Sequence, residues 1–250
     1  MSRVLFIFLL IFIPGIALSQ QNVRDSSISF FVIGASAAYQ FPGGDLSDRF
    51  GNNMNVGGFF QWKTKSNLIF GIEGQFIFGN TVKEDDILNS LATDQGGIIA
   101  SDGSFADVIL YERGYKFDFK VGKIFPVIGP NKNSGLLATV SSGILQHKIR
   151  IENQSSAVPS IEDDYKKGYD RLSNGLSVSA FLGYVNYSNH RMVNFYAGFE
   201  LTKGFTQNRR SFNYDTREHD ARKRNDLLLG IRVGWMIPIY KRTPKQFYYN

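Results

Sequence analysis

The side chains best suited to catalysis or metal binding are scattered along the chain. The three histidines, His147, His190 and His219, are expected at a strand exit, in a turn and in a long loop. Residues so placed are not neighbours, so neither a zinc site nor a Ser–His pair is predicted, and we expect isolated surface histidines. The absence of cysteine excludes a thiolate metal site, a disulfide framework and a lipoprotein anchor. We therefore predict no enzyme activity and no cofactor.

Two acidic triplets offer a second kind of chemistry. Glu84-Asp85-Asp86 and Glu162-Asp163-Asp164 carry the carboxylate oxygens that Ca²⁺ prefers. Neither triplet has the spacing of a calcium-binding loop, so solvated loop charge is the favoured interpretation over a calcium site.

Composition restricts the class of protein. The formal net charge is +6 and 14% of the residues are aromatic. The basic residues do not form one face, because Asp and Glu lie beside them, so no nucleic-acid partner is predicted. A mean hydropathy of −0.17 is typical of a soluble protein, but it also fits strands that alternate apolar and polar residues.

The first 19 residues have the form of a signal peptide. Arg3 precedes an apolar stretch over residues 4–14, and small residues at Ala17 and Ser19 suit signal peptidase. Cleavage is expected after Ser19 or Gln20. The apolar run is too short to span a membrane as a helix, and Pro14 interrupts it.

A period of two dominates the rest of the chain. Over residues 227–239 every odd position is apolar, whereas the even positions include Arg232, two glycines and Pro238. Such alternation is typical of a strand with one apolar face. Similar segments occur near 55–62, 68–79, 115–122, 136–144, 176–184 and 193–202, and a further one near 31–39 has no clear apolar face.

The connections between these segments alternate in length. Short connections are predicted at 64–67, 128–134 and 188–191, and long ones at 41–54, 80–107, 152–174 and 207–225. Outer-membrane barrels combine short periplasmic turns with long external loops in this way. We predict an all-β, eight-stranded antiparallel transmembrane up-and-down barrel over residues 27–240, with periplasmic segments at 20–26 and 241–250. The alternative is a soluble lipocalin-like barrel whose apolar faces point inward around a ligand.

The polar faces of these strands carry charges into a narrow lumen. The predicted inward charges are Glu73, Glu112, Lys116, Asp118, Lys120, Glu200 and Arg232, with Lys63 at the periplasmic rim to balance them. Charges of opposite sign in such a lumen are expected to pair, because unpaired burial is costly. We predict a closed salt-bridge network, with a proton or ion path as the alternative.

Three segments resemble a known group. Residues 41–46 (FPGGDL), 194–205 and 229–240 resemble Bacteroidota outer-membrane β-barrel proteins of small, OmpA/OmpX-like type, whose role is uncharacterised. The resemblance implies location in the cell outer membrane among lipid and lipopolysaccharide, after insertion by the barrel assembly machinery. It also implies that Gly234, Trp235, Ile237 and Tyr240 form the insertion signal.

Two classes of function remain open. In the first, the barrel is a structural or docking component of the cell envelope with an envelope protein partner, and the resemblance implies a role beside a secretion or gliding apparatus. In the second, its loops recognise an external surface. Basic residues at 208–210 and 217–224 suit lipopolysaccharide phosphates or a solvated loop. A fixed apolar patch outside the lipid band would favour docking.

Overall fold

The computed structural model describes residues 26–154, 157–188 and 193–240. The expected signal peptide over 1–19, nearly all of the 20–26 segment and the 241–250 tail lie outside these residues.

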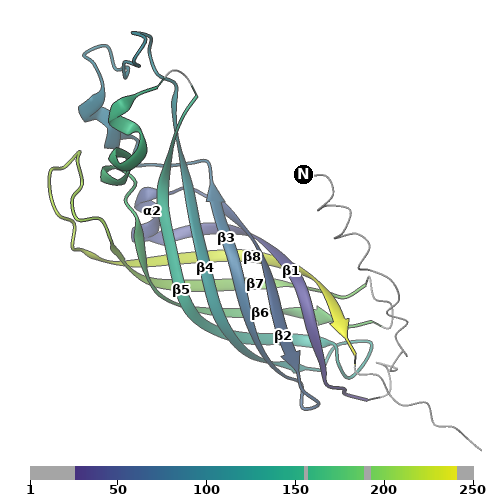
Figure 1. Cartoon of the computed structure of the whole chain (residues 1–250). Helices are drawn as coiled ribbons and strands as arrows, with labels where there is room; N and C mark the ends of the chain where they lie inside the picture. Colours follow the sequence, from purple (N-terminus) through teal and green to yellow (C-terminus); the bar gives the residue numbers. More distant parts are fainter. Residues whose placement is uncertain (1–25, 155–156, 189–192, 241–250) are drawn as a thin grey trace, which may run out of the picture.

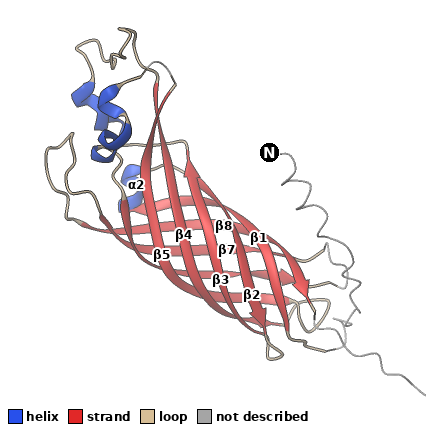
Figure 2. Ribbon diagram, viewed as in Figure 1, coloured by secondary structure: helices blue, strands red, loops and turns tan. Residues whose placement is uncertain are grey.

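Eight strands close into one antiparallel barrel in chain order, as Figures 1 and 2 show. Their bounds are β1 Phe30–Gly44, β2 Asn53–Lys63, β3 Leu68–Gly79, β4 Val108–Phe125, β5 Gly135–Asn153, β6 Ser173–Asn186, β7 Phe195–Asn208 and β8 Lys223–Ile239. The ring closes between β1 and β8, from Phe31 opposite Ile239 to Gly44 opposite Asp226. The predicted eight-stranded up-and-down barrel is confirmed.

Connections of different length gather at opposite ends of the barrel. The short turns at 64–67 and 126–134, and the described ends of the third at 187–188 and 193–194, lie at the end that also holds Ser26 and Tyr240. The long connections lie at the other end (Figure 2) and carry α2 Asp45–Arg49 and the 3₁₀ helices η1 Asp85–Leu91, η2 Pro159–Ile161 and η3 Asp163–Gly168. No helix in the described ranges is long and apolar enough to cross a bilayer. The first long connection is shorter than predicted, because β1 continues to Gly44 alongside β8.

Large apolar side chains cover the outside of the wall. Phe117 and Phe199 are 67% and 64% exposed, and the odd positions of β8 from Leu227 to Ile239 all face outward. On β1, whose orientation the sequence left open, the pairing with β8 turns Ile33 outward and Val32 inward. The expectation for a soluble ligand-binding barrel, with apolar residues inside and charges outside, is therefore wrong.

Two clusters of buried apolar residues are present, one at each end of the barrel. We call the one at the short-turn end the turn-end cluster: Ile28, Phe30, Val32, Phe59, Ile69, Ile124, Leu137, Phe181, Val185, Tyr187, Tyr196 and Met236. The loop-end cluster joins the wall to the long connections and comprises Leu46, Phe50, Ile87, Leu88, Ala100, Ile149, Ile151, Val158, Ile161, Tyr169 and Leu228. The charged residues occupy the strands between them.

Glycines make room for the rings of the turn-end cluster. A Cβ atom on Gly34 would lie 2.3 Å from Cζ of Phe59, and one on Gly234 would lie 2.1 Å from Cε1 of Tyr196. Real Cβ atoms do not approach carbon so closely, so these two strand positions accommodate only glycine while the rings stay in place. The rings thereby fill the lumen without widening the barrel.

Candidate functional site

The charged layer in the middle of the lumen is centred on Arg232. This arginine, on β8, forms ion pairs with Glu73 of β3 and, over 2.7 Å, with Glu200 Oε2 of β7. Glu73 also pairs with Lys120 of β4 and accepts hydrogen bonds from Ser36 and Gln75. The layer therefore connects strands across the lumen as well as around the wall.

Lys116 forms the second centre of this layer. Its ammonium lies 2.9 Å from Asp118 Oδ2 and 3.6 Å from Glu200 Oε1. It also donates to the hydroxyls of Ser179, at 2.6 Å, and Thr202, at 3.1 Å. The structure thus brings together six of the seven predicted charges, three acidic and three basic. This balance suits groups that are almost completely removed from water.

Two predicted members lie outside the charged layer. Glu112 faces inward but accepts hydrogen bonds from Asn53 Nδ2 at 3.1 and 3.0 Å, and no cation of the described residues forms an ion pair with it. Lys63, expected to balance the acids, is instead surrounded by oxygen atoms at the short-turn end. Its ammonium donates to Asn133 Oδ1 at 2.8 Å and to the carbonyl of Ile28 at 3.0 Å. Lys63 therefore lies at the rim expected for it but does not balance the acids of the layer, whereas the separation of Glu112 from the layer depends on strand tilt.

His147 is not the surface residue that the sequence analysis expected. It faces the lumen and is 2% exposed, and its Nε2 lies 2.9 Å from Asp226 Oδ2. Asp226 also accepts a hydrogen bond from Thr206 at 2.5 Å. The odd positions of β5 face inward, and His147 shares their parity, which was the signal available in the sequence. His219 is exposed as expected, and His190 lies outside the described residues.

The long connections are joined by ion pairs above the charged layer. Arg49 of α2 is 3% exposed and donates to Glu84 at 3.1 Å and to Ser173 Oγ at 3.3 Å. Arg171 pairs with the same Glu84 and with Asp215. Burial disfavours the charged form of Arg171, but the contacts with Asp215 and Glu84 outweigh it and raise the pKa of Arg171. The left-handed φ of 50° at Arg171 is held by these contacts.

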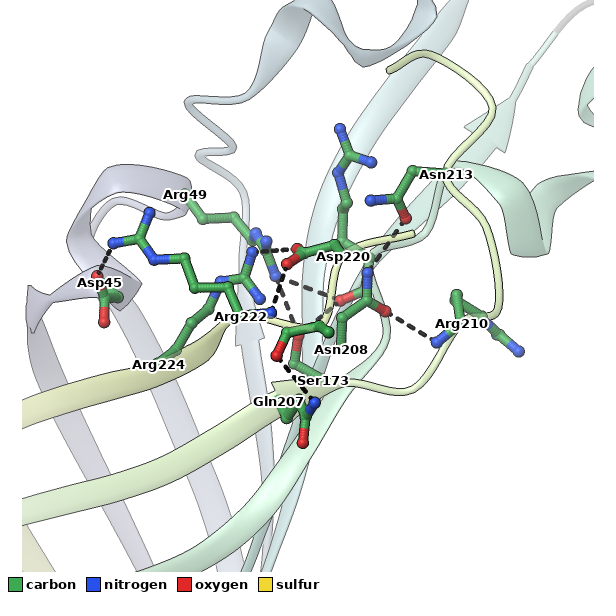
Figure 3. A network of polar contacts seen from close by, with 12 residues as sticks. Asp45, Arg49, Ser173, Gln207, Asn208, Arg210, Asn213, Asp220, Arg222 and Arg224 are labelled. Atoms are coloured by element: carbon green, nitrogen blue, oxygen red, sulfur yellow. Dashed lines mark hydrogen bonds and ion pairs between the residues drawn. The ribbon is translucent and has the colours of Figure 1, made fainter. Parts of the chain in front are cut away.

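Two arginines of the last loop are directed toward neighbouring carboxylates, as Figure 3 shows. Arg222 lies 2.9 Å from Asp45 Oδ1 of α2, and Arg224 pairs with Asp220. Burial raises the pKa of Asp220, but hydrogen bonds from the Arg224 side chain and the Arg222 amide outweigh it and lower that pKa below its usual range. These contacts hold the loop to the barrel rim, and Arg210, Arg222 and Arg224 are paired with carboxylates of the same chain.

The acidic triplets do not form a metal centre in the part of the chain that the structure describes, where no three His, Cys, Asp or Glu residues are placed to hold an ion. Glu84 instead holds Arg49 and Arg171, and Asp164 pairs with Lys167 at 2.5 Å. Both triplets thus contribute to the contacts of the long connections.

The residues predicted as the insertion signal lie on both faces of β8. Trp235 and Ile237 face outward, whereas Gly234 faces inward beneath the Tyr196 ring. Tyr240 follows the strand and packs edge-on against Phe30, with ring centroids 5.1 Å apart. Their role in insertion stays a prediction.

We compared the chain with protein families, curated sequences and solved structures. The sequence matches no protein-family model and no curated protein sequence. Solved structures similar to it include the N-terminal β-barrel domain of Pseudomonas aeruginosa OprF, with 12% identity, a TM-score of 0.38, and coverage of 82% of this chain and 97% of that domain. Ail, the attachment invasion locus protein of Yersinia pestis, is similar at 13% identity and a TM-score of 0.36, covering 85% of this chain and 99% of Ail. The relationship to Bacteroidota barrels stays a prediction.

Proposed function

We propose that this chain is an integral barrel of the cell outer membrane that does not conduct, and that it serves the envelope as a structural or docking component. The observation that carries the proposal is the distribution of side chains across the wall. Apolar residues cover the outside, while paired charges occupy the inside between the two apolar clusters. Lipid can surround the apolar outer surface, and the filled interior argues against a conducting channel.

The lumen is filled at three levels. Rings of Phe59, Phe181 and Tyr196 pack edge to face at the short-turn end, with centroids 5.5–5.7 Å apart. The charged layer lies beyond them, and the loop-end cluster covers the opposite opening. An ion crossing the barrel would have to displace paired charges and closely packed rings, so we favour closure over a conduction path.

The test combines heat modifiability with conductance. Detergent-extracted protein should migrate faster on SDS gels before boiling than after, because the closed barrel resists SDS. In planar bilayers it should give no steps under conditions where an open porin gives clear ones. Solubility without detergent and unchanged migration would refute the membrane barrel, and reproducible conductance would refute closure alone.

The docking role is supported by an ordered apolar tip on the long connection between β3 and β4. Ile99 and Phe105 face each other across a small hairpin and are 53% and 57% exposed. Its backbone is fixed by hydrogen bonds from Ala100 to Ser104, at 2.8 Å, and from Ala106 to Ile98, at 2.7 Å. An exposed apolar pair on a hydrogen-bonded hairpin beyond the barrel wall offers a surface for a protein contact.

We expect a photo-crosslinking residue at position 105 to label one defined envelope protein in intact cells. The same residue at position 165, also an exposed aromatic position but on η3, is the control. Labelling of the same protein from both positions would argue against a hairpin contact. Labelling only of material added outside the cells would favour the alternative function, recognition of an external surface by the loops.

A further inference from the structure

The outer wall carries a basic groove at the loop end of β4 and β5. The groove has a volume of about 360 Å³ and is lined by Phe76, Arg113, Tyr115, Gln146, Lys148, Ile149, Arg150, Ile151, Lys166 and Asp170. Its basic side chains come from outward positions of the two strands and from η3. The strand-borne basic side chains of the groove therefore lie on the side of the wall that faces lipid in the proposed membrane barrel.

Like charges lie opposite each other at the centre of the groove. Arg113 of β4 pairs in register with Lys148 of β5, and Tyr111 pairs with Arg150 on the loop side. Like charges at directly opposed positions destabilise an antiparallel pair. A bound anion between Arg113 and Lys148 would remove this repulsion.

The carboxylates near the groove do not neutralise its centre. Asp170 is held by Arg210, and Glu152 by Arg150 at 2.5 Å. The guanidinium of Arg113 donates to the carbonyls of Glu112 and Gly79, at 2.7 and 3.4 Å, while Glu112 directs its own side chain into the lumen. Within the described residues, Arg113, Lys148 and Lys166 have no carboxylate partner.

The groove lies where the wall changes from basic to apolar. Along β4 the outward residues change from Arg113 to Tyr115, Phe117 and Phe119, and along β5 from Lys148 to Gln146 and Ile144. A molecule with its anionic group between Arg113 and Lys148 would have the exposed rings of Tyr115 and Phe117 directly beside it. That combination fits a lipid with a phosphate headgroup, because Arg and Lys bind phosphate strongly and the apolar wall accommodates acyl chains.

We propose that this groove is a specific site for the phosphate of an outer-membrane lipid, whose acyl chains lie along β4 and β5. The site rests on the proposed membrane location. It differs from the last loop, in which Arg210, Arg222 and Arg224 pair with carboxylates of the same chain.

The test measures lipid retention by native mass spectrometry on the full-length protein in detergent. The probes are lipid A with both phosphates, the same lipid with its phosphates removed, and inorganic phosphate as a competitor. We expect the phosphorylated lipid to bind about tenfold tighter than the dephosphorylated one, as the loss of charge-assisted hydrogen bonds predicts. The variant Arg113→Gln/Lys148→Gln should lose this preference.

The matched control is Lys203→Gln, which removes a lipid-facing lysine on β7 that lies over the Phe205 ring. It should leave the preference unchanged. Equal retention of both lipids by the unaltered protein would overturn the proposal even if the double variant did not fold. If millimolar inorganic phosphate displaced the lipid, the site would bind free phosphate and the proposal of a lipid headgroup would be wrong. Heat modifiability of the same samples tests the membrane barrel separately, so failure of the site and failure of the proposed function are distinguishable.

Discussion

Replacing Arg232 with alanine is expected to lower the free energy of unfolding by about 3–5 kcal/mol, the range found when one partner of a buried ion pair is removed. The substitution leaves Glu73 and Glu200 in the lumen without their shared cation. Lys116 and Lys120 remain nearby, but each already has an acidic partner. Urea unfolding in detergent micelles, followed by the fluorescence of the two tryptophans, measures the change.

Two control variants distinguish the cost of leaving a buried charge unpaired from the cost of losing any ion pair. Arg222→Ala removes an ion pair of which the arginine is 68% exposed, and it should cost only about 0–1 kcal/mol. Adding Glu200→Gln to Arg232→Ala should recover part of the loss, because the layer then holds two acidic and two basic groups, and Lys116 and Lys120 keep Asp118 and Glu73 as partners. A loss of less than about 1 kcal/mol for Arg232→Ala would show that water reaches the charged layer, which would contradict a closed lumen.

The substitution Gly143→Ala is expected to prevent formation of the heat-modifiable barrel. A Cβ atom at this inward position of β5 would lie 1.7 Å from the carbonyl oxygen of Phe117 and 2.7 Å from Oδ1 of Asp118. The first contact is with backbone, so a rotamer change cannot relieve it, and β4 and β5 would have to separate. Overpacking of a core commonly costs about 1–3 kcal/mol, and a backbone clash adds to that cost.

Gly58→Ala is the matched control. This glycine also lies in mid-strand, on β2, but its added Cβ would meet one backbone oxygen at 3.7 Å. It should refold with the yield of the unaltered protein and show the same shift on SDS gels. If Gly143→Ala also refolded normally, β4 and β5 would not approach each other at Gly143 and Phe117 as closely as the structure indicates.

The sequence by itself determined the strand order of the barrel and which face of its strands is apolar. Period-two alternation over 227–239 placed the apolar positions of β8 on one face, and the alternation of short and long connections predicted an up-and-down barrel. Both features are local, because side-chain direction in a strand depends only on parity and turn length depends only on the intervening residues. The inward orientation of Glu73, Lys116 and Arg232 followed from the same parity.

The tertiary structure alone determined which residues lie opposite one another. β1 has small or apolar residues on both faces, so its orientation depended on pairing with β8, which lies far away in the sequence. The separation of Glu112 from the charged layer depended on strand tilt and stagger, which parity does not contain. Three further contacts join strands whose register only the closed barrel specifies. They are the packing of rings over Gly34 and Gly234, the contact of His147 with Asp226, and the opposition of Arg113 and Lys148.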